Sequence, residues 1–151
     1  MSLSRRGLTT VVATFFGVGY FPIWPATLAS FLGAVLAWFA YDNLLFWCVG
    51  LSLAGFWACI DARAALGADD PGPFVMDEVC GMALSVLWIP KTGVFFAAAF
   101  LLFRFFDAVK PWPISVIQNN KHSWSIMGDD LLAGVFTNLL LRVAAPLLAS
   151  R

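Results

Sequence analysis

The sequence has little charge for its length. Only 12% of the 151 residues are charged, against about 25% in a typical soluble domain, whereas 61% are hydrophobic and 16% aromatic. Nine basic and nine acidic residues leave a formal net charge of zero, which removes the electrostatic basis for binding nucleic acid. This composition predicts an integral membrane protein in which residues 1–151 form one domain. Nothing in the sequence indicates an oligomeric state.

Several familiar catalytic arrangements are also missing. The cysteines Cys48, Cys59 and Cys80 show no C-x-x-C spacing, and none precedes an arginine by the five-residue spacer of cysteine phosphatases. The single histidine, His122, lies in a polar segment, where a solvated side chain is the more ordinary interpretation than a general acid or base. No Ser/His/Asp set and no D-x-D nucleophile can be proposed. A covalent enzyme intermediate is therefore disfavoured.

Apolar runs alternate with polar segments along the chain. The segment 17–27 is rich in glycine and proline, which disfavours a regular helix there. Five apolar runs follow, and each predicts a helix: 28–40, 44–60, 79–89, 94–106 and 131–149. The predicted fold class is all-α, a polytopic helical membrane protein of about five short helices. Several runs are shorter than the ~20 residues that cross a bilayer, so some helices are expected to enter it only in part.

Counting each apolar run as one crossing places the longer polar segments on one side. These are 17–27, 61–78 and 104–130, and eight of the nine carboxylates share their side, Asp42 being the exception. Six of the nine basic residues lie there too: Arg5, Arg6, Arg63, Arg104, Lys110 and Lys121. The positive-inside rule makes this side cytoplasmic, so one polar site facing the cytoplasm is predicted.

Three charges stand where a long apolar run ends. Arg104, Asp107 and Lys110 are spaced i, i+3 and i+6, which brings them onto one face of a helix. Pro111 and Pro113 cannot continue that helix, so we expect it to end near Lys110. Taken alone, the pattern fits equally a salt-bridged helix end at the edge of the bilayer.

Two acidic pairs, Asp77-Glu78 and Asp129-Asp130, directly precede two of the predicted helices. Helix capping explains one carboxylate of each pair but not the second. Together with Asp107 they place five carboxylates at one membrane surface, where they repel one another unless a cation neutralises them. Carboxylate ligands favour Mg²⁺ over zinc, and the nearby basic residues suit a phosphate-bearing ligand. The reaction favoured is attack of metal-activated water on a phosphomonoester.

Four blocks carry glycines, prolines and charged residues in a fixed order. They read Gly17-x-Gly19-x-x-Pro22-x-x-Pro25-x-Thr27-x-x-Ser30, Asp70-x-Gly72-x-x-Val75-x-Asp77-Glu78-x-x-Gly81-Met82, Phe103-Arg104-x-x-Asp107-x-x-Lys110-Pro111-Trp112-Pro113 and Ile126-Met127-x-Asp129-Asp130-x-x-Ala133-Gly134. In these blocks the sequence resembles the phosphatidylglycerophosphatase A family. The resemblance implies an Mg²⁺-dependent enzyme of the bacterial cytoplasmic (inner) membrane. Its phospholipid substrate would be phosphatidylglycerophosphate, which loses its terminal phosphate in phospholipid biosynthesis to give phosphatidylglycerol.

The resemblance and the charge pattern together assign roles to single residues. Mg²⁺ is expected at Asp77, Glu78, Asp129 and Asp130, and phosphate at Arg104 and Lys110, helped by Thr27 and Ser30. The expected catalytic residues are Asp107, Asp77 and Asp130. Asp107 would act either as a further metal ligand or as the base that activates water. Where the family usually has glycines, this chain has Ala26, Ala29 and Ser123-Trp124-Ser125, and the added Cβ atoms restrict φ near the phosphate.

Two other classes of membrane protein fit the sequence less well than a phosphatase does. A small transporter or channel subunit would use the acidic clusters as a cation vestibule, but it needs charge near the bilayer midplane. Residues 28–60 and 79–103 carry only Asp42 and Lys91, both in predicted turns. A transferase of lipid head groups is disfavoured because its D-G-x-x-A-R motif is absent.

Overall fold

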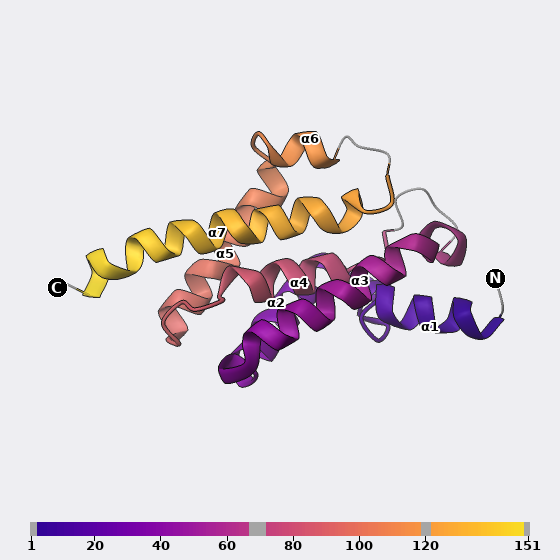
Figure 1. Ribbon diagram of the computed structural model, residues 1–151, viewed down its shortest axis with the longest axis horizontal. Helices are drawn as coiled ribbons and strands as arrows, with labels where there is room; N and C mark the ends of the chain where they lie inside the picture. The colour runs from indigo at the N-terminus through magenta and orange to yellow at the C-terminus, as the bar shows by residue number, and fades with distance from the viewer. Residues whose placement is uncertain (1–2, 67–71, 119–121, 150–151) are drawn as a thin grey trace.

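The computed structural model describes residues 3–66, 72–118 and 122–149 (Figure 1). These residues form an all-helical structure, without any strand among them. The α-helices are α1 (Leu3–Ala13), α2 (Pro25–Phe39), α3 (Leu44–Leu66), α4 (Met76–Ser85), α5 (Gly93–Val109), α6 (Ile114–Gln118) and α7 (Ser125–Ala149). Short 3-10 helices lie at Val18–Tyr20 and Tyr41–Asn43.

The predicted all-α class is confirmed, and the five predicted helices correspond to α2, α3, α4, α5 and α7. Two further helices were not predicted: α1 precedes the five in the chain, and α6 lies between α5 and α7. The predicted start of the last helix at residue 131 is wrong, since α7 begins at Ser125. The pair Asp129-Asp130 therefore lies in the second turn of α7 and not at its start. The first turns of α7 contain polar residues, so hydrophobicity alone does not predict a helix there. They are helical in the structure, where Met127 is buried in the core.

The ends of α5 follow from its local sequence. At its start the Thr92 hydroxyl accepts a hydrogen bond from the Phe95 amide at 3.3 Å, the usual N-cap arrangement. At its end Lys110 adopts the left-handed conformation, with φ of 46°, and its amide donates to the Phe106 carbonyl. Pro111 then prevents continuation. The predicted helix end is confirmed.

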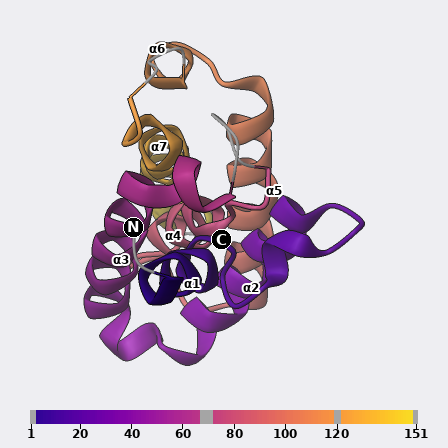
Figure 2. The ribbon, with the colours of Figure 1, turned by 90° about the vertical axis from the view of Figure 1, so that its right-hand side faces the viewer.

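Helix α4 forms the centre of the structure (Figure 2), because α2, α3, α5 and α7 all pack against it. Nearly all of its residues are buried: Met76, Glu78, Val79, Cys80, Gly81, Met82, Ala83 and Ser85. An apolar helix of this length can be buried on every side only when other helices surround it. The acidic pair at its start is thereby drawn into the protein.

Helices α4 and α7 cross at two glycines. A Cβ atom added to Gly134 would lie 2.4 Å from the Gly81 carbonyl oxygen, and one added to Gly81 would lie 2.6 Å from the Asp130 carbonyl oxygen. No larger residue fits against backbone at such distances. The close crossing brings the second turn of α7 beside the first turn of α4.

The turn after α2 and the turn after α4 contact each other, at the end of the structure away from the two acidic pairs. The Tyr41 hydroxyl donates a hydrogen bond to the Ile89 carbonyl at 2.5 Å. The Lys91 ammonium lies 5.5 Å from the ring centroids of both Trp38 and Tyr41. The turns after α2 and after α4 therefore share one end, as the alternating pattern predicted.

Within the described residues, one stretch has the length and apolar composition of a membrane span, Tyr41–Ala62, and 28% of its most apolar window is buried inside the protein. Helix α2 is a shorter apolar helix. On α3 large apolar side chains face outward, with Phe46, Leu53 and Ile60 at 79%, 66% and 67% exposure. This outer surface is consistent with association with a membrane.

Candidate active site

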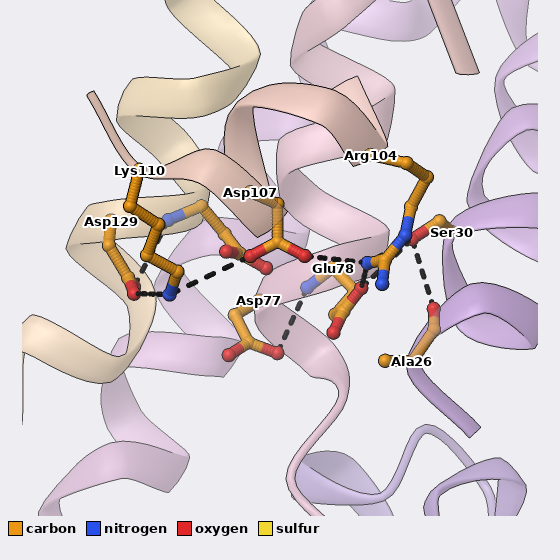
Figure 3. Close-up of polar contacts among 9 residues, drawn as sticks. Ala26, Ser30, Asp77, Glu78, Arg104, Asp107, Lys110 and Asp129 are labelled. Atoms are coloured by element: carbon orange, nitrogen blue, oxygen red, sulfur yellow. Dashed lines mark hydrogen bonds and ion pairs between the residues drawn. The ribbon is translucent and has the colours of Figure 1, made fainter. Parts of the chain in front are cut away.

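The candidate site lies where α5 ends and α2, α4 and α7 begin. Figure 3 shows its side chains pointing toward one another from these four helices. They are Ser30 from α2, Asp77 and Glu78 from α4, Arg104, Asp107 and Lys110 from the end of α5, and Asp129 from α7. The structure thus brings together residues up to a hundred positions apart, as predicted.

Arg104 is the centre of one half of the site. Its Nη1 atom donates to Glu78 Oε2 at 2.6 Å and to Asp107 Oδ2 at 2.7 Å. The Ser30 hydroxyl donates to the same Glu78 oxygen at 2.9 Å. Hydrogen bonds between charged groups are stronger than neutral ones. This network therefore fixes the start of α2 and of α4 relative to the end of α5.

Lys110 organises the other half. Its Nζ atom donates to Asp129 Oδ2 at 2.5 Å and lies 3.6 Å from Asp107 Oδ1. Asp107 consequently stands between Arg104 and Lys110, which confirms that the three charges share one helix face. The side chains of Arg104 and Lys110 keep 25% and 20% of their surface exposed, so a ligand can reach them.

The two acidic pairs have the same local geometry. Asp77 Oδ1 accepts from the Glu78 amide at 2.9 Å, and Asp129 Oδ1 accepts from the Asp130 amide at 3.1 Å. Glu78, Asp129 and Asp130 are almost fully buried. Charged carboxylates this deep require partners of opposite charge.

Positive charge is scarce in the cluster. Burial raises the pKa of Asp77 well above its usual value, and the neighbouring carboxylates, Glu78 first, raise it further. Burial lowers the pKa of Lys110, but the hydrogen bond and charge of Asp129 outweigh this and leave it above its usual value. Five carboxylates thus share two basic side chains.

Metal binding depends on the chemistry of these donors. Among the residues that the structure describes, no three acidic, histidine or cysteine side chains stand close enough together to hold a metal ion as they are placed here. The donor set itself suits a hard divalent cation, since it offers buried carboxylate oxygens in excess over bases. Asp129 and Glu78 are paired with Lys110 and Arg104 instead. The Mg²⁺ site stays a prediction.

The remaining predicted residues lie nearby or outside the described part. Thr27 is half-buried in the first turn of α2, one turn before Ser30. Asp70, which belongs to the second sequence block, lies outside the described residues. His122 is exposed and stacks on Trp124, with ring centroids 6.2 Å apart, as expected for a surface residue.

Sequence reasoning missed what Gly81 and Gly134 do. Both stand in the four sequence blocks, but the blocks alone do not show that these two glycines meet where α4 and α7 cross. The sequence does contain a signal for a close helix crossing. In each helix a glycine follows an acidic residue by four positions, among mostly apolar side chains. The two glycines let α4 and α7 approach closely, which places the two acidic pairs beside each other.

Fold and site together define an all-helical protein with a buried acidic cluster and two accessible basic side chains, an arrangement suited to a phosphate-bearing ligand. The chain belongs to the phosphatidylglycerophosphatase A family, whose model matches residues 11–145. This confirms the resemblance drawn from the four sequence blocks. It also confirms the predicted enzyme class, a phosphatase of phospholipid biosynthesis, over a transporter or channel subunit.

Curated relatives cover most of the chain. Phosphatidylglycerophosphatase A of Escherichia coli (strain K12) is 33% identical over 136 residues, which are 84% of this chain and 77% of the relative. The Haemophilus influenzae protein of the same name is 31% identical over 138 residues, 87% and 85% of the two chains. A Bacteroides thetaiotaomicron protein named "Putative phosphatidylinositol-3-phosphatase" is 33% identical over 150 residues, 91% and 93%. No solved structure matches the chain.

Proposed function

We propose that the protein hydrolyses the terminal phosphomonoester of phosphatidylglycerophosphate to phosphatidylglycerol and phosphate. The observation that carries the proposal is the placement of Arg104 and Lys110 on either side of Asp107, next to the buried acidic pairs. Two accessible cations a few ångströms from a carboxylate bind a phosphate dianion and leave a base beside it. Family membership supports the same reaction.

The residues of the site divide between binding and proton transfer. Arg104 and Lys110, with Ser30 and Thr27 at the start of α2, hold the phosphate oxygens. Asp107 orients the attacking water and accepts its proton as the new oxygen–phosphorus bond forms. The bond from phosphorus to the glycerol oxygen breaks, and that oxygen takes the proton that Asp107 accepted from water, which gives the free alcohol and returns Asp107 to its carboxylate form. Phosphate binding frees Glu78 and Asp129 from their present cationic partners.

Asp77, Glu78, Asp129 and Asp130 are the proposed ligands of Mg²⁺. An ion held by these carboxylates would supply positive charge to the phosphoryl oxygens and would lower the pKa of bound water. The support for this assignment is the excess of buried carboxylates over basic side chains, since carboxylate oxygens are the ligands that Mg²⁺ prefers.

The proposed setting is the bacterial inner membrane, with several crossings and the site on the cytoplasmic side. The distribution of basic residues along the sequence supports this orientation. Single cysteines at the exposed positions Gly72, His122 and Thr92 test it, because Cys48, Cys59 and Cys80 are buried. In oriented vesicles, labels at Gly72 and His122 should react from the cytoplasmic face and at Thr92 from the other. The reverse pattern would refute the orientation.

Phosphate release by purified, detergent-solubilised protein tests the reaction. Phosphatidylglycerophosphate should be hydrolysed with Mg²⁺, and hydrolysis should stop with a chelator and resume when Mg²⁺ is restored. Phosphatidylinositol 3-phosphate, the lipid in the name of the Bacteroides relative, is the comparison substrate. Faster hydrolysis of this lipid would refute the proposed head group, and full activity with a chelator would refute the metal.

A further inference from the structure

An apolar groove lies between α2 and α5. Its walls include Phe31, Ala34 and Val35 from α2 and Phe96, Ala97 and Phe100 from α5. We call it the α2–α5 groove. Its volume of about 450 Å³ falls within the ~300–1,000 Å³ of pockets that enclose small ligands. A lining with almost no polar surface suits hydrocarbon.

One end of the α2–α5 groove adjoins the candidate site. Phe31 directly follows Ser30 on α2, and Phe100 lies one turn before Arg104 on α5. The Phe31 and Phe100 rings meet at this end, with centroids 6.5 Å apart and planes at 90°. An apolar group in the groove is therefore continuous with a polar group held by Arg104.

The α2–α5 groove is closed at the end away from the candidate site and open along one side. Trp38 and Phe96 close the far end, with ring centroids 5.0 Å apart. Trp38 lies seven positions after Phe31, which at 1.5 Å per residue gives a length of about 10 Å. Phe31 and Phe39 are 54% and 82% exposed along the rim, so the groove opens sideways onto the outer apolar surface. A chain in a surrounding bilayer can enter without crossing water.

We infer that the α2–α5 groove holds the part of one acyl chain nearest the head group of the phospholipid substrate while its phosphate lies at Arg104 and Lys110. This inference rests on the proposed function. A protein helix, about 10 Å wide, is too large an occupant for a groove of this volume, and free phosphate would leave it unused. The chain moves from bilayer hydrocarbon into an apolar groove, so the gain is mainly correct placement of the head group and not hydrophobic burial.

Filling the groove tests the inference. Val35→Trp and Ala97→Phe add bulk to the two walls, and Val49→Trp is the matched control, since Val49 is 51% exposed on α3 outside the groove. Each protein is assayed in detergent micelles with dioleoyl and with dibutyryl phosphatidylglycerophosphate. The ratio of kcat/KM for the long-chain over the short-chain lipid should fall about tenfold in both groove variants. The control should keep the wild-type ratio.

A phospholipid with a photoreactive group in its acyl chain gives a second readout on the wild-type protein. Cross-links should map to α2 and α5, and Val35→Trp should remove them. Equal cross-linking of the outer face of α3, or an unchanged kcat/KM ratio in both groove variants, would overturn the inference. A changed oligomeric state of Val35→Trp with an unchanged ratio would assign the groove to a second copy of the chain. A wild-type protein inactive on both lipids would overturn the proposed function itself.

Discussion

Two helix pairs supply the site and differ in the size of the residues between them. Between α4 and α7 the contact is made by Gly81 and Gly134, and the two backbones nearly touch. Between α2 and α5 it is made by aromatic rings, Phe31 with Phe100 and Trp38 with Phe96. The glycine contact closes one pair around buried carboxylates, whereas the aromatic contact holds the other apart and leaves a groove.

The largest effect is expected from the carboxylates of the closed pair. Asp77→Asn or Asp129→Asn should lower kcat/KM at least about a thousandfold, because each removes a proposed Mg²⁺ ligand and its charge. Folding should not suffer, since one fewer carboxylate reduces the repulsion in the cluster. Phosphate release and thermal unfolding measure the two effects. Asp42→Asn, exposed at the opposite end, is the control, and turnover near wild type by either site variant would refute the metal assignment.

The second prediction concerns a substitution that separates α4 from α7 and leaves every charged residue in place. Gly134→Ala places a Cβ 2.4 Å from the Gly81 carbonyl oxygen, so α4 and α7 must separate. Overpacking of this kind costs about 1–3 kcal/mol of folding free energy, and we expect activity to fall about a hundredfold as the acidic pairs move apart.

Gly50→Ala is the matched control, because a Cβ at Gly50 on α3 meets nothing within 4 Å. It should leave activity unchanged and stabilise α3 by up to ~1 kcal/mol. If Gly134→Ala retained wild-type activity, the close crossing would not be what places the carboxylates.

The sequence predicts the features of the site that depend on neighbouring residues, but not those that depend on which helices pack together. The charged face of Arg104, Asp107 and Lys110 follows from helical spacing and a proline stop, both local signals, and the structure has it as expected. The crossing at Gly81 and Gly134 is not local. Which two helices are neighbours depends on how all of them pack around α4, and no short stretch of sequence contains that information.

The prediction that the last helix starts at residue 131 was wrong for a related reason. Its first turns, from Ser125 to Asp130, are polar enough to resemble a loop when only hydrophobicity is considered. They are helical because Met127 is buried against α3 and α4 and because α6 packs on α7, with the Ile117 side chain beside Gly128. Tertiary contacts here override the local pattern.

The third prediction concerns the end of α5, which belongs to both sides of the site. Lys110→Ala removes an attraction to the phosphate present in the ground and transition states, so KM should rise about tenfold with a smaller loss of kcat. Asp107→Asn removes the proposed base, so kcat should fall about a hundredfold with KM little changed. Val109→Ala, exposed on the same turn, is the control. If excess Mg²⁺ restores Asp107→Asn, then Asp107 is a ligand and not the base.

The smallest effect is expected where α2 reaches the closed pair. The Ser30 hydroxyl donates to Glu78 Oε2 at 2.9 Å, and Arg104 binds the same oxygen at 2.6 Å, so Glu78 keeps its charged partner when the hydroxyl is lost. Ser30→Ala should therefore cost about 1 kcal/mol of stability and about fivefold in kcat/KM, as the start of α2 loosens beside the phosphate.

Ser85→Ala separates the catalytic part of this effect from the structural part. Ser85 is equally buried and donates to the Gly81 carbonyl at 2.8 Å, but it lies at the far end of α4. Both variants should unfold at similar temperatures, while only Ser30→Ala should lose activity. An equal loss in both would mean that stability alone limits turnover. No loss in Ser30→Ala would mean that α2 borders the site only through its groove, which would sharpen the contrast between the two helix pairs.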